Sequence, residues 1–204
     1  MSVRSVIAAA ILTLLVGCAS WQTAYDAPVS SDVSKNWRLN SVSVDVPLTL
    51  SVGEANVYAP STDIVWQEEL LPTGTTRHAQ VDAIMTDAVR RGASALPGSR
   101  PVDIQVVVSR FHALSDYARV RLSQEGVHNI NFTLQVTDAG TGAVLVPATP
   151  IQSDLVAFTG QDSIDALAAG QTQKVRITQH VAETVAGFLG VGPDNRAEFT
   201  RLGR

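Results

Sequence analysis

The sequence is poor in cysteine and in positive charge. Cys18 is the single cysteine among 204 residues, so no disulfide can form within one chain, and a zinc site built on several thiolates is excluded. Lys and Arg number 15 against 19 Asp and Glu, a formal net charge of -4. Because nucleic-acid recognition needs a concentrated basic face, we expect no nucleic-acid partner.

Long apolar runs and internal repeats are also missing after the N-terminus. No segment beyond residue 17 is apolar over the 18 or more residues that a membrane-spanning helix needs. The remaining chain is long enough to bury one hydrophobic core. The sequence therefore predicts a signal peptide over 1–17, a tether over 18–36, a single domain over 37–192 and a loose tail over 193–204.

The N-terminus has the pattern of a secretory signal. Arg4 supplies a positive charge, residues 6–16 form an apolar run broken only by Thr13, and the small residue Gly17 follows. The run is too short to span a membrane. An ordinary signal peptide and an uncleaved anchor are the alternatives to a lipoprotein signal.

The end of this segment resembles the lipobox of bacterial lipoproteins, in the run Leu15-Val16-Gly17-Cys18. The resemblance implies that Cys18 carries acyl chains such as palmitate and becomes the mature N-terminus, so that the protein is anchored to a membrane. Ala19 stands where lipoproteins retained at the inner membrane often have Asp. This favours the periplasmic face of the outer membrane.

The segment after Cys18 has no periodicity. Ser, Asp and Ala dominate residues 19–36, and Pro28 lies in their middle, so we expect a flexible tether that spans about 25 Å on average. Trp21 and Tyr25 are then either at the level of the lipid headgroups or exposed to solvent.

Alternating apolar and polar residues predict strands. Pro47 falls on the outward phase of the first such segment, which indicates an edge strand or a break into two strands. Asp138–Gly142 reads as a hairpin turn. The expected strands cover residues 42–52, 102–108, 117–122, 130–136 and 144–146, with one short piece at 64–66 and a last one at 155–158.

Two segments have the periodicity of an amphipathic helix. Apolar residues repeat from Val81 to Val89, where Gly92 is placed to end the helix, and again from Ile177 to Leu189. The second helix begins either at Asp162 or only after Gly170. The order of elements predicts an α+β fold, with a mostly antiparallel sheet of four to five strands and two helices packed on one face.

This order behind a lipobox resembles small outer-membrane lipoproteins that assist lipid and lipopolysaccharide transport. Three runs, at residues 63–66, 109–114 and 126–130, are also similar to a family of bacterial lipoproteins labelled only as a domain of unknown function. The second resemblance covers most of the mature chain. It implies no activity and transfers no catalytic residues.

A histidine pair is the strongest candidate for a ligand site. His112 is in phase with Val108 at the end of one predicted strand, and His128 is in phase with Ile130 at the start of another. If these strands are antiparallel neighbours, both imidazoles reach the same rim of the sheet. Such a rim could bind a phosphate or carboxylate, helped by the arginines in the connecting region, Arg110, Arg119 and Arg121.

The alternative is that both histidines bond to backbone at the sheet edge. No third metal ligand has a recognisable spacing, so we expect neither a metal nor a cofactor. Glu68 and Glu69 are adjacent and give no basis for a glycosidase-like pair. Trp66 beside them is either buried in the core or an exposed aromatic residue of an interface.

No catalytic constellation stands out, since Gly92–Leu96 lacks the last glycine of a nucleophile elbow and Gly140–Gly142 lacks the lysine of a phosphate loop. The leading hypothesis is a non-enzymatic adaptor or accessory subunit of an envelope or transport complex, with a protein or lipid partner. The alternatives are a small-ligand binder or enzyme that uses His112 and His128, and a purely structural spacer.

Overall fold

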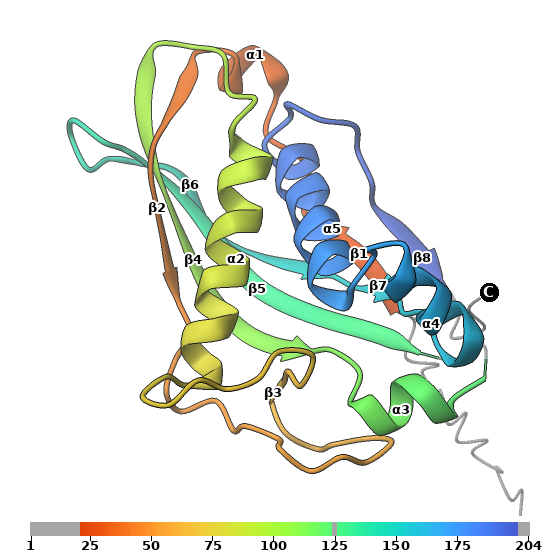
Figure 1. Ribbon diagram of the computed structural model, residues 1–204. Helices are drawn as coiled ribbons and strands as arrows, with labels where there is room; N and C mark the ends of the chain where they lie inside the picture. Colours follow the sequence, from red (N-terminus) through yellow and green to blue (C-terminus); the bar gives the residue numbers. More distant parts are fainter. Residues whose placement is uncertain (1–20, 124–125, 200–204) are drawn as a thin grey trace, which may run out of the picture.

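The computed structural model describes residues 21–123 and 126–199, so the predicted signal peptide and Cys18 lie outside the described residues. An eight-stranded sheet forms the body (Figure 1), with the order β2-β4-β5-β6-β1-β8, while β3 pairs with β4 and β7 with β5. Among the strand pairs of the described residues, β2–β4 and β3–β4 are parallel and the others are antiparallel. The strands are β1 Trp21–Tyr25, β2 Trp37–Asp45, β3 Ile64–Val65, β4 Arg100–His112, β5 Val127–Asp138, β6 Val144–Ser153, β7 Leu155–Val156 and β8 Ala197–Phe199.

Two long helices, α2 Arg77–Ala93 and α5 Gln173–Phe188, lie side by side over one face of the sheet (Figure 1). They bury the apolar stripes that the sequence predicts, against the inward residues of β4 and β5. The α+β prediction is therefore confirmed, although the sheet has more strands than expected. The shared core includes Val81, Ile84, Met85, Val89, Ile104, Val106, Phe132, Leu134, Ile177, Val181 and Val185.

Gly92 does not end α2, which continues to Ala93. A Cβ atom at this position would lie 2.5 Å from the Ala182 carbonyl oxygen and 2.8 Å from Cβ of Val185. The glycine thus allows α2 and α5 to approach closely, and the helix ends one residue later, with Ser94 as its C-cap.

The tether prediction is wrong from Trp21 onwards. Residues 21–25 form β1, an inner strand between β6 and β8, and Thr23 and Tyr25 are buried. Ser31–Ser34 add a short helix, α1. The tail prediction is wrong for β8, which pairs with β1. Pairing with strands more than 100 residues away, rather than a local pattern, creates order at both ends of the domain.

The predicted strand at residues 117–122 is wrong, because Asp116–Arg121 form a helix, α3. The Ser115 hydroxyl accepts a hydrogen bond from the backbone N–H of Ala118, which is an N-cap. The last helical region holds two helices in place of one. α4 covers Gly160–Ala168 and so begins before Asp162, whereas α5 begins after Gly170, whose φ is +74°, as the second alternative predicts.

Pro47 marks the end of the first predicted strand. β2 stops at Asp45, and residues 47–50 form a turn. β2 is an edge strand, as the proline indicated. β6 continues through Pro147 and Pro150, so it is longer than the strand predicted at residues 144–146. The β5–β6 register shifts between Leu134 and Val136, and this irregularity accommodates Pro147.

Candidate functional site

His112 lies at the end of β4, on the face of the sheet away from α2 and α5. The β4–β5 register shifts between Val108 and Arg110, which places Phe111 in the core phase. His112 is paired with Asn129 in the ladder. Because successive residues of a strand alternate between faces, the bulge turns His112 to the face opposite to the one that its spacing from Val108 predicts.

His128 precedes Asn129 and therefore points to the helix-covered face, as predicted from its phase with Ile130. It is buried, and neither ring nitrogen has a hydrogen-bond partner among the described residues. Burial, with the nearby charges of Arg176 and His180, lowers its pKa to about 3. The two imidazoles lie on opposite faces of the sheet, so the prediction that they share one rim is wrong.

A groove of about 380 Å³ opens beside His112. It is lined by β1, by the loop before β3, by the end of β4 and by the chain that flanks α3. The Nε2 atom of His112 is buried in its wall without a hydrogen-bond partner among the described residues. Burial and the adjacent Arg110 lower the pKa of His112, which the Thr62 backbone and Asp63 partly oppose. The lining includes Trp21, Tyr58, Pro60, Arg110, His112, Leu114 and Leu122.

Two exposed tyrosines lie at the mouth of this groove. The rings of Tyr58 and Tyr117 meet edge to face with centroids 4.6 Å apart, and the guanidinium of Arg121 lies 5.9 Å from the Tyr117 centroid. The backbone N–H of Tyr117 donates to Oδ1 of Asn56 at 2.6 Å. The loop before β3 and the start of α3 thus hold both rings in place.

Arg119 and Trp66 do not join the groove. Arg119 is mostly buried, forms an ion pair with Asp116 at 3.3 Å and lines a different cavity. Trp66 is fully buried, packs edge to face on Phe111 and donates from Nε1 to Glu69 at 3.2 Å. The prediction of Trp66 as a partner contact is therefore wrong, and its alternative, a core residue, is confirmed.

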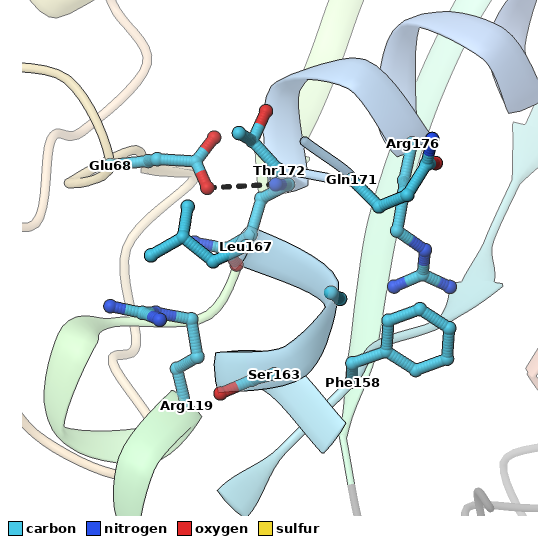
Figure 2. Close-up of a pocket in the computed structure, with 10 residues that line it drawn as sticks. Glu68, Arg119, Phe158, Ser163, Leu167, Gln171, Thr172 and Arg176 are labelled. Atoms are coloured by element: carbon cyan, nitrogen blue, oxygen red, sulfur yellow. Dashed lines mark hydrogen bonds between the residues drawn. The ribbon is translucent and has the colours of Figure 1, made fainter. Parts of the chain in front are cut away.

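Figure 2 shows the cavity that Arg119 lines, between α3, α4 and the start of α5. Its volume of about 20 Å³ suits little more than one water molecule. Glu68 accepts hydrogen bonds at 2.7 Å from the backbone N–H groups of Gln173 and Lys174. The Arg176 guanidinium stacks 3.7 Å from the Phe158 centroid. These contacts indicate a structural role, in which Glu68 caps α5.

We predict that Glu68→Ala lowers the free energy of unfolding by about 1–2 kcal/mol, because two N–H groups at a helix start lose a charged acceptor. Urea unfolding monitored by circular dichroism measures this loss. Glu183→Ala is the control, since its carboxylate only accepts from Gln179 on the surface of the same helix, and we expect a change within about 0.5 kcal/mol. Equal losses in both variants would contradict the capping role.

A buried polar network around Asp154 was not predicted from the sequence. The carboxylate accepts from Asn129 Nδ2, from Gln152 Nε2 at 2.6 Å and from the Gln22 backbone N–H at 3.2 Å. Thr23 donates to the Asp154 carbonyl at 3.1 Å. Burial raises the pKa of Asp154, while the hydrogen bonds from Asn129 and Gln152 oppose this. The network fastens β1 to the rest of the sheet.

His180 joins the Asp154 network from α5, since its Nε2 lies 2.9 Å from the Thr23 hydroxyl. Burial lowers its pKa. Within residues 21–123 and 126–199 no group of three or more His, Cys, Asp or Glu side chains could hold a metal ion. In the same part of the chain, no helix is long and apolar enough to cross a bilayer.

The fold and groove define an α+β domain in which two helices cover one face of a mixed, mostly antiparallel sheet and a groove opens on the other. The chain belongs to DUF6778, a family of unknown function, whose family model matches residues 37–204. Membership in a family of unknown function agrees with the resemblance seen in the sequence. No curated protein sequence matches the chain.

Three solved structures are similar to the chain at low TM-scores. An uncharacterised protein is 16% identical, with a TM-score of 0.42, and the match covers 79% of this chain and 92% of that one. The PelC dodecamer from Paraburkholderia phytofirmans is 10% identical, with a TM-score of 0.33 and coverage of 82% and 96%. A Caulobacter crescentus CB15 protein, provisionally described as a lipoprotein, is 14% identical, with a TM-score of 0.29 and coverage of 53% and 82%. No activity or assembly is carried over from them.

Proposed function

We propose that the protein is a lipid-anchored accessory subunit of an envelope complex. Acylated Cys18 holds it at the periplasmic face of the outer membrane, and the domain binds a protein or lipid partner without catalysing a reaction. The lipobox at residues 15–18 and the Ala19 that follows it support the anchor and its membrane.

The distance between the anchor and the sheet carries this proposal. Only Ala19 and Ser20 separate Cys18 from Trp21, the first residue of β1. Three residue steps span at most about 11 Å when fully extended. An anchor this close to an inner strand fixes the domain at the membrane surface. A flexible tether of 18 residues, by contrast, would let the domain turn freely. Such fixed presentation suits a subunit that adds to a larger assembly.

Crosslinking in living cells tests the proposal. The full chain is crosslinked, purified and analysed by mass spectrometry, which also reports the mass of the acyl chains on Cys18. We expect an acylated N-terminus and one envelope protein or a lipid class enriched in the crosslinked products. The same cells without crosslinker are the control.

Three outcomes would overturn the proposal. An unmodified Cys18 would remove the anchor, and an acylated protein that yields only free small molecules would favour a ligand-binding role. Self-crosslinks alone would instead favour the structural spacer.

A further inference from the structure

The surface around the groove carries the exposed aromatic residues of the domain. Among the large apolar side chains that are exposed in the described residues, the aromatic ones are Tyr58 and Tyr117, at 50% and 39%. Val120, 51% exposed, lies one helical turn after Tyr117 on α3 and so shares its side of the helix. We call this surface, with Trp21, Arg110 and Arg121, the α3 face.

Trp21 ties this face to the N-terminus. It lines the groove together with Tyr58 and Arg110, and Cys18 is at most about 11 Å from it along an extended chain. The α3 face therefore lies close to the membrane in which Cys18 is anchored. Tyr and Trp side chains are enriched at the level of lipid headgroups, since their rings are apolar and their tips are polar.

The charges of the face match lipid phosphates. Among the described residues neither Arg110 nor Arg121 forms a salt bridge. Hydrogen bonds from Ser51 lower the pKa of Asp63, and the charge of Arg110 adds a smaller effect. The nearby Asp116 carboxylate is paired with Arg119. Guanidinium groups without a carboxylate partner are the preferred ligands of phosphate oxygens.

We infer that the α3 face is the surface on which the domain rests on the phospholipid headgroups of its own membrane, with a lipid phosphate bound by Arg110 and Arg121 at the groove. This inference rests on the proposed anchor at Cys18. It deepens the proposed function, because it fixes which side of the domain faces the lipid and leaves the helix-covered side, α2 and α5, turned away for a partner.

Single cysteines in the full, acylated chain test the inference. Because an acylated Cys18 has no free thiol, a fluorescent label reacts only with the introduced residue. Val120→Cys samples the α3 face, and Val33→Cys and Val144→Cys are matched controls with 48% and 56% exposure. In Figure 1, α1 and the hairpin between β5 and β6 lie at the end of the molecule opposite to α3.

The labelled proteins are placed in vesicles of phosphatidylethanolamine and phosphatidylglycerol that contain a nitroxide lipid. We expect the label at position 120 to shift to the blue and to lose intensity through the nitroxide, while both control labels keep the emission seen in water. Arg110→Gln with Arg121→Gln should remove the shift, whereas Arg38→Gln with Arg90→Gln, exposed residues elsewhere, should not.

Each contrary result has a separate meaning. A reactive thiol in the wild-type chain, which could only be Cys18, or a missing acyl mass overturns the anchor and with it the proposed function. An acylated protein whose three labels behave alike overturns the α3 face only. A blue shift at position 120 that the nitroxide lipid does not quench shows contact with another protein or copy and also overturns it. A shift that survives Arg110→Gln with Arg121→Gln overturns the phosphate site.

Discussion

The protein is expected to leave the membrane fraction when residues 1–17 are replaced by a secretory leader that is cleaved before position 18 and Cys18 is changed to serine. One acyl chain gives an association constant of only about 10⁴ M⁻¹, and stable anchoring needs more than one. The resemblance to bacterial lipoproteins implies several chains on Cys18. Fractionation of cells, followed by immunoblotting, measures the shift, and we expect nearly all of the protein to become soluble.

The original leader with Cys18 intact is the control, and it should stay with the membrane in high salt. If the α3 face binds headgroups, the Cys18→Ser protein keeps a weak, salt-sensitive affinity for anionic vesicles, since screening reduces the attraction of exposed charges. A Cys18→Ser protein that stays in the membrane fraction in high salt would contradict the lipid anchor.

Local patterns identified the centre of this fold well. Val102, Ile104 and Val106 of β4 and Ile130, Phe132 and Leu134 of β5 are buried as their alternation predicts. The apolar stripes of α2 and α5 are buried in the same way. Each of these segments is long enough for its periodicity to be unambiguous, and each faces a single core.

The ends of the sheet could not be predicted in this way. β1 is held by β6 and β8, through the pairs Thr23 with Ser153 and Trp21 with Phe199. Its five residues show too little periodicity to reveal such distant partners. For α3 the local pattern was misleading. The alternation of six residues predicted a strand at 117–122, whereas the N-cap at Ser115 starts a helix.

The prediction of a shared histidine site is wrong because β4 contains one extra residue. One extra residue in a strand reverses the face of every side chain after it. The β4 irregularity near Ser109 does this to His112, and nothing in the apolar pattern from Val102 to Val108 signals it. His128 has no such bulge before Ile130, so its face was predicted correctly.

The acid stability of the domain is expected to depend on His128. Its pKa is about 3 in the folded protein and about 6.5 when unfolded. As pH falls below 6.5 the unfolded chain binds a proton that the folded chain does not, so stability is lost at up to about 1.4 kcal/mol per pH unit. Between pH 6.5 and 4.5 the loss from this one group is about 2 kcal/mol.

His128→Leu should remove that loss. Leucine fills a similar volume without two unpartnered ring nitrogens, so we expect a free energy of unfolding within about 1 kcal/mol of wild type at pH 7. At pH 4.5 the variant should be more stable than wild type by about 2–3 kcal/mol. Urea unfolding of the secreted Cys18→Ser form at a series of pH values measures both.

Other groups titrate in the same range, so the comparison between variants decides the result. The pKa of His112 is lowered as well, and His112→Asn should flatten the acid slope less, because that imidazole is only half-buried. Asp154 acts with the opposite sign, since burial raises its pKa and the folded state then gains stability as pH falls. Its contribution is common to wild type and His128→Leu and cancels in their difference. Parallel curves for these two proteins would therefore show that His128 is solvated or paired in solution, and that the helix-covered face is more open than its packing indicates.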